Sequence, residues 1–213
     1  MPETKAPATK KGRETRERIL QAAAELVAEK GAAVMSLDDV RARTGASRSQ
    51  LYHYFEDRDD LVRTVIDVTT DAVIDVQGDL LHHLDSWAAI DRWFDALVRL
   101  QVDRQARGGC PIGSLAGQLA EQDPGARTAI AGGLERWESH LRDGLVRMKA
   151  RGKLRKDADP AELATATMAS IQGGLLLTQV RRDPGQLRTA LEAARANLRL
   201  NASHRPNPRR KET

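Results

Sequence analysis

Apolar residues recur three and four positions apart along almost the whole chain, which places them on one face of an α-helix. Runs of alternating β-branched residues, which would indicate half-buried strands, are missing. The pattern therefore predicts an all-α protein of about nine helices. They are expected over residues 14–30, 37–43, 47–54, 57–83, 86–107, 110–121, 124–151, 160–181 and 184–201.

Asp-Pro pairs mark the starts of three of the later helices, at residues 123–124, 159–160 and 183–184. An aspartate can accept hydrogen bonds from the free N–H groups of a helix start, and proline is favoured at the first helical position. We expect a helix to begin at each of these pairs.

The most informative segment is SLDDVRARTGASRSQLYHYF, which predicts two short helices joined by a turn. Ser36 with Asp39 has the spacing of a capping box, and Ser47 with Gln50 repeats it. Gly45 suits the end of the first helix, where a positive φ is common. Two helices joined in this way form a helix-turn-helix unit, whose second helix can enter the major groove of DNA.

The second of these helices presents side chains that can bind DNA. Leu51 and Phe55 lie four positions apart and are expected to anchor one face in the core. Arginine can bind guanine and glutamine can bind adenine through paired hydrogen bonds, while serine, tyrosine and histidine can contact phosphates. The alternative is an ordinary polar helix face exposed to solvent. The cluster of aromatic and hydrogen-bond donor groups favours DNA binding.

A longer pattern surrounds these two helices. It consists of RILxAAxxL at 18–26, Gly31, GAS at 45–47, LYxYF at 51–55, and Arg58 with Leu61. Together these positions, within Arg13 to Val65, resemble the DNA-binding domain of the TetR (tetracycline-repressor-like) transcription regulators. Arg58 stands where the family usually carries lysine, which keeps the charge.

The resemblance implies a regulator, most often a repressor, that binds a near-palindromic double-stranded operator as a homodimer and releases it when a small-molecule effector binds. No cofactor, metal site or catalytic residue is predicted. The residues predicted to contact DNA are Ser36, Ser47, Arg48, Ser49, Gln50, Tyr52, His53, Tyr54 and Arg58.

The resemblance also divides the chain into a helix-turn-helix domain at 13–56 and a ligand-binding and dimerisation domain at 57–202. Residues 1–12 and 203–213 are expected to be disordered basic tails. They are either solvated ends or arms that add phosphate contacts. Excess positive charge lies at the two ends: residues 1–55 hold ten Lys and Arg against seven acidic residues, and residues 199–213 hold five against one.

Other bulk properties narrow the class of protein. The net charge of +4 fits an anion-binding protein but is modest. One cysteine excludes an intrachain disulfide. No apolar run approaches the roughly 20 residues that span a bilayer, and no signal-peptide pattern opens the chain. We therefore expect a cytoplasmic protein with no membrane partner.

The aromatic residues outside the DNA-binding segment all lie between residues 87 and 137. By resemblance, the central helices would enclose the effector pocket, and the few charges near Leu115 predict an apolar ligand. Large aromatic side chains suit ordinary core packing as well. The candidate ligand-binding residues are Trp87, Trp93, Phe94, Cys110, Leu115 and Trp137.

Cys110 precedes Pro111, which is expected to be the first residue of a helix. A thiol at a helix N-terminus is stabilised as the thiolate, whereas a free cysteine is often a small buried apolar residue. The run G-C-P-x-G-S-L resembles a motif in one branch of TetR-like regulators, some of which sense electrophiles through this cysteine. Both interpretations stay open.

The last two helices carry apolar stripes that predict a dimer interface, because similar helices in TetR-like proteins pair with their symmetry mates. The alternative is that both stripes complete the core of the single chain. A glycine pair at 173–174 suggests close backbone approach. The predicted interface residues are Ile171, Gly174, Leu175, Leu191 and Leu198.

Two other classes of function compete with this one. An enzyme could use Cys110 as nucleophile with His82, His83 or His140 as base, but no nucleophile signature surrounds the cysteine. Metal catalysis is not favoured either. His82 and His83 are adjacent, so on a helix their side chains point about 100° apart and are poorly placed to bind one metal ion. The second rival is an architectural DNA-binding protein, whose DNA affinity would be indifferent to small molecules.

Overall fold

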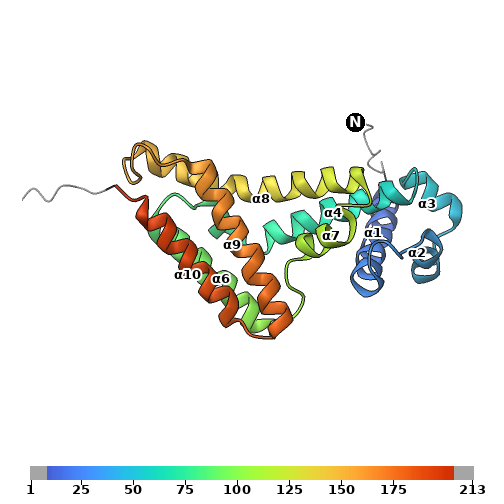
Figure 1. Ribbon diagram of the computed structural model, residues 1–213. Helices are drawn as coiled ribbons and strands as arrows, with labels where there is room; N and C mark the ends of the chain where they lie inside the picture. Colours follow the sequence, from blue (N-terminus) through green and yellow to red (C-terminus); the bar gives the residue numbers. More distant parts are fainter. Residues whose placement is uncertain (1–8, 204–213) are drawn as a thin grey trace, which may run out of the picture. The chain divides into compact units, whose positions relative to one another are not determined.

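The computed structural model describes residues 9–203, which form ten helices and no strand, with an isolated antiparallel bridge between Leu154 and Ala202 (Figure 1). The all-α prediction is confirmed. The helices are α1 (Lys10–Lys30), α2 (Leu37–Thr44), α3 (Arg48–Tyr54), α4 (Arg58–Asp75), α5 (Gly78–His82), α6 (Trp87–Asp103), α7 (Pro111–Leu119), α8 (Pro124–Ala150), α9 (Pro160–Arg181) and α10 (Gly185–Leu200).

The helix expected over 57–83 is in fact two helices. α4 ends at Asp75 and α5 begins at Gly78, whose φ of +54° is not helical. Gln77 lies between them and turns its side chain inward. The helix expected over 86–107 also ends earlier, at Asp103, because Gln105 and the residue after it adopt positive φ.

The first helix begins four residues before its predicted start. α1 starts at Lys10, since the Thr9 hydroxyl accepts a hydrogen bond from the Gly12 N–H at 3.1 Å and caps the helix. The disorder predicted for residues 9–12 is therefore wrong. Ser203, the first residue of the predicted C-terminal tail, donates its N–H to the Lys153 carbonyl at 3.0 Å. The remaining tail residues, 1–8 and 204–213, lie outside the described residues.

The chain forms two compact units. Of the described residues, the first comprises those up to Val73 together with Pro111–Leu134, and the second comprises Ile74–Cys110 together with those from Glu135 onward. The first unit therefore contains α7 and most of α4 as well as the three N-terminal helices.

The core of the first unit is built by the apolar faces of its helices. Ile19 and Ala23 of α1 are fully buried, as is Val40 of α2. Leu51 and Phe55 are 1% and 2% exposed, which confirms their predicted role as the inward anchors of α3. Burying a large apolar side chain contributes roughly 1.5–3 kcal/mol, so these residues fix the orientation of α3.

In the second unit α9 and α10 run side by side, and α6 also packs on α10 (Figure 1). Gly174 permits the close approach of α9 to α10, because a Cβ there would lie 2.9 Å from the side chains of Leu187 and Ala190. Ion pairs join α10 to α6: the Arg195 and Arg199 guanidinium groups lie 2.9 and 2.8 Å from the Asp91 carboxylate.

Candidate functional site

Both predicted capping boxes are present in the helix-turn-helix. The Ser36 hydroxyl accepts from the Asp39 N–H at 3.1 Å, and the Asp39 carboxylate accepts from the Ser36 N–H at 3.0 Å. Ser47 and Gln50 repeat this exchange at 3.1 and 2.9 Å. Gly45 ends α2 with a φ of +68°, as predicted. These local bonds set where both helices begin and how the chain turns between them.

The cap of α2 is also joined to the end of α1. The Lys30 ammonium lies 2.7 Å from the Asp39 carboxylate. This hydrogen bond, with those from Ser36, lowers the pKa of Asp39 to about 2. The carboxylate therefore stays ionised at neutral pH and holds the first two helices together through one side chain.

Five side chains of α3 are exposed, those of Arg48, Ser49, Gln50, Tyr52 and His53. The Arg48 guanidinium lies over the Tyr52 ring, 5.6 Å from its centroid. Tyr54 is half-buried and its ring packs edge-on against that of His53, at 4.9 Å between centroids. Donors and aromatic edges thus share the surface opposite the buried anchors.

Two residues of the predicted DNA-binding set also have structural roles. Gln50 uses its side-chain oxygen in the cap of α3. The Arg58 guanidinium donates to the carbonyls of Met35, at 2.8 Å, and Ala32. These two bonds join α4 to the turn between α1 and α2, a role that no local sequence signal could have revealed because the partners lie more than 20 residues away. Phosphate contact by Arg58 stays a prediction.

A cavity of about 230 Å³ lies in the second unit, beside the break between α4 and α5. Both Trp93 and Trp137 donate their indole N–H groups to the Gln77 side-chain oxygen, at 2.8 and 3.1 Å. Sequence reasoning missed Gln77, which carries no motif of its own. The lining residues are Val76, Gln77, Leu80, Trp93, Ala96, Leu97, Arg99, Leu100 and Asp103.

The structure does not gather the predicted ligand-binding residues around this cavity. Trp93 lines it, but Phe94 and Trp137 are buried in the helix packing of the same unit. The ring of Trp87 is covered by the Arg199 guanidinium, 4.7 Å from the ring centroid. Leu115 and Cys110 do not line it either, and Leu115 belongs to the first compact unit.

Cys110 is buried, at 7% exposure, and is not in a disulfide. Pro111 is the first residue of α7, as predicted. Burial favours a packing role, because a reactive thiolate needs access to its reagent. The sensing role and the branch of the family that its motif suggests remain predictions.

The five predicted dimer-interface residues are all buried within the single chain, with exposures of 5% or less for Ile171, Leu175, Leu191 and Leu198. This burial agrees with the alternative interpretation, in which both stripes complete the core of the single chain. The exposed apolar residues of α9 lie on its other face. They are Leu176, Leu177 and Val180, at 59%, 42% and 72% exposure.

Within residues 9–203, no group of three or more His, Cys, Asp or Glu side chains is arranged to hold a metal ion. The rings of His82 and His140 lie 4.8 Å apart between centroids. Burial, followed by the neighbouring His82, lowers the pKa of His140. None of the helices described is both long and apolar enough to cross a membrane.

Comparison with proteins of known sequence identifies relatives along most of the chain. An uncharacterised HTH-type transcriptional regulator of Mycobacterium tuberculosis is 29% identical over 182 residues, covering 79% of this chain and 86% of the relative. The HTH-type transcriptional repressor DhaR of Mycobacterium sp. strain GP1 is 22% identical over 180 residues, covering 79% and 84%.

Solved structures share the fold. A transcriptional regulator of the TetR family from Cytophaga hutchinsonii superposes with a TM-score of 0.77 at 18% identity, covering 93% of this chain and 100% of that one. A TetR transcriptional regulator from Chloroflexus aurantiacus gives 0.75 at 24% identity, covering 91% and 98%.

Two family models match the sequence. Residues 19–65 match the bacterial regulatory proteins of the tetR family, and residues 87–194 match the tetracyclin repressor-like C-terminal domain. The first match covers the helix-turn-helix, and the second spans half of the chain. This protein therefore belongs to the TetR family of transcriptional regulators.

Proposed function

We propose that this protein is a homodimeric repressor that binds a near-palindromic operator through α3 and releases it when an apolar small molecule binds the second unit. The observation that carries the proposal is the outward face of α3. Its exposed donors lie opposite two buried anchors, on a helix whose start is fixed by a capping box. A recognition helix needs this rigidity, because base contacts tolerate little displacement.

Arg48 provides the sharpest test of the DNA contact. Its side chain caps nothing, whereas a change at Gln50 would remove a helix cap together with any base contact. The operator is first selected from random DNA fragments. Arg48→Ala should then cost about 1–3 kcal/mol in operator binding and relax preference at one base position.

The matched comparison is Arg13→Ala, on the exposed start of α1. Loss of a phosphate contact should weaken binding to all sequences alike and reduce the salt dependence. Unchanged affinity and unchanged base preference in Arg48→Ala would refute α3 as the recognition helix.

The exposed apolar face of α9 supports the dimer. Gly173, Leu176, Leu177 and Val180 lie on this face, at spacings of three and four. Contiguous exposed apolar surface of this kind marks interaction sites, and pairing with a second copy by twofold symmetry would bury it on both chains.

Leu177→Glu should give monomers and abolish operator binding, because it places a charge in the apolar interface. Ala88→Glu, at an exposed position of α6, is the matched control and should leave the dimer intact. Sedimentation at micromolar concentration shows whether each variant is a monomer or a dimer. Wild-type protein that sediments as a monomer would rule out this interface.

The 230 Å³ cavity supports an apolar effector site, since five of its lining residues are aliphatic and Trp93 adds an aromatic wall. Ala96→Phe should fill the cavity and make operator binding insensitive to a panel of apolar compounds. Ala88→Phe places the same ring at an exposed position of the same helix as control. Compounds that stabilise the protein but never alter its operator affinity would instead favour the architectural DNA-binding protein.

A further inference from the structure

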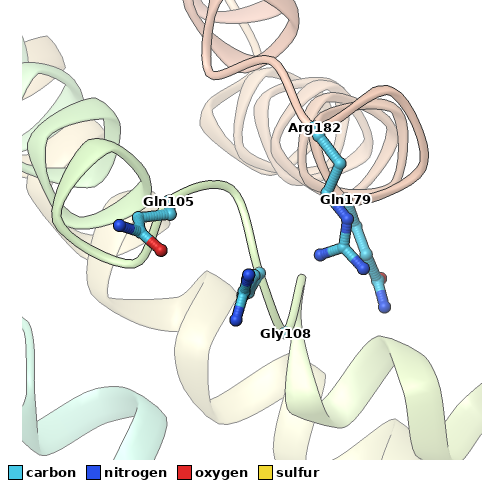
Figure 2. Close-up of a pocket in the computed structure, with 5 residues that line it drawn as sticks. Gln105, Gly108, Gln179 and Arg182 are labelled. Carbon is cyan, nitrogen blue, oxygen red and sulfur yellow. The ribbon is translucent and has the colours of Figure 1, made fainter.

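A cavity of about 450 Å³ lies in the second unit, between the loop that follows α6 and the C-terminal end of α9. Figure 2 shows Gln105 on one side, Gln179 and Arg182 together on the other, and Gly108 between them. Arg107 completes the lining. Two arginines and two glutamines therefore line one space, and none of the lining residues is acidic.

The loop is folded so that it faces the end of α9. Gln105 and Ala106 adopt positive φ angles of 53° and 55°, which are uncommon for residues other than glycine. The Ala106 carbonyl accepts a hydrogen bond from Arg182 at 3.2 Å, which ties the loop to α9. Gly109 also has a positive φ, of 55°, which glycine adopts readily, and the Gln179 side-chain oxygen lies close to its Cα.

The positive charge of the cavity is not neutralised by an ion pair with any of residues 9–203. Among the described residues, neither Arg107 nor Arg182 forms an ion pair. Asp183 follows Arg182 directly, but its carboxylate accepts instead from the Gly185 N–H and the Gln186 amide, both at 2.8 Å. The Gln186 hydrogen bond, followed by that from Gly185, lowers the pKa of Asp183.

We propose that this cavity binds a small anion that carries a carboxylate or phosphoryl group. Planar guanidinium groups match both groups through paired hydrogen bonds, and the glutamine amides can donate to the remaining oxygens. The volume lies within the range of small-molecule sites, roughly 300–1,000 Å³. This anion site is separate from the apolar cavity, with which it shares no lining residue.

Calorimetric titration of the full chain with inorganic phosphate, and separately with succinate, tests the proposal and distinguishes the two kinds of anion. Ionic strength is kept constant with sodium chloride, so that general screening does not change. No DNA is present, so the outcome does not depend on the regulatory function proposed above.

Arg107→Gln and Arg182→Gln should each weaken binding about tenfold or more, because each removes a charged bidentate donor. Arg182 also ties the loop to α9, whereas the Arg107 side chain bonds to none of the described residues, so Arg107→Gln stays informative if Arg182→Gln disturbs the loop. Arg104→Gln is the matched control: it removes the same charge next to the loop from an exposed residue that does not line the cavity. It should leave binding within about twofold.

Saturable binding of either anion that requires Arg107 and Arg182 but not Arg104 supports the site. Binding of neither anion overturns the proposal. It is equally overturned if Arg104→Gln weakens binding as much as Arg107→Gln, because the anion would then respond only to overall charge.

Discussion

The side-chain oxygen of Gln118 accepts a hydrogen bond from the backbone N–H of Ala32 at 2.7 Å. Gln118 lies on α7 and Ala32 in the turn between α1 and α2, so this bond joins residues 86 positions apart. A Cβ on Gly31 would approach the same oxygen to 3.1 Å. A helix from the middle of the chain thus contacts the backbone that positions the helix-turn-helix.

Gln118→Leu should lower the free energy of unfolding by about 1–3 kcal/mol, because it leaves the buried Ala32 N–H without its acceptor. Gln122→Leu, at an exposed position shortly after α7, is the control and should change stability little. Urea denaturation measures the free energy of unfolding of both variants. Equal stability of the two variants would show that water replaces the bond without cost.

The two adjacent glycines of α9 should respond in opposite ways to alanine. Gly174→Ala should destabilise the protein by about 1–3 kcal/mol, since the added methyl would collide with α10. A methyl group added at Gly173 would meet no atom within 4 Å, so Gly173→Ala should be neutral or stabilise by up to about 1 kcal/mol. Thermal unfolding of the pair tests this, and equal losses would contradict the packing described.

Stability in acid should depend on Asp39. Its pKa of about 2 in the folded protein lies below the ordinary 3.8, so its ionised form stabilises the fold. That stabilisation is present above pH 3.8 and is lost as the pH falls towards 2. Asp39→Asn should therefore remove part of the pH dependence in this window.

Asp38→Asn is the matched control, because Asp38 is on the same helical turn but caps nothing. Unfolding is followed as a function of pH for all three proteins. A wild-type curve that matches that of Asp39→Asn through the acid range would refute the assignment.

Cys110 should react with maleimide more slowly in the native protein than in urea, because its side chain is buried. Cys110→Ser should retain operator binding. If the native thiol instead reacts faster than the unfolded one, its position before α7 activates it, and the electrophile-sensing interpretation gains support.

Local chemistry was predictable from the sequence. Both capping boxes, the glycine that ends α2 and the proline that begins α9 act within one helical turn, so their residue types suffice. Gln50 was predicted to contact DNA, and the structure shows that its side-chain oxygen accepts from the Ser47 N–H.

Hydrogen bonds between helices far apart in the sequence were not predictable. Gln77 and Arg58 are defined by partners on other helices, and a single sequence does not show which helices meet. The choice of dimer-interface residues from the sequence was limited for a related reason. α9 is apolar on both faces, so its pattern cannot say which face meets α10 and which is exposed.

The shared hydrogen-bond acceptor on Gln77 has a practical consequence. Two of the three tryptophans of the chain donate to this one oxygen, beside the cavity and the break between α4 and α5. Indole emission shifts with the polarity and hydrogen bonding around the ring. The protein therefore carries a native optical reporter at this junction, and movement of α5 can be followed in real time without any attached dye.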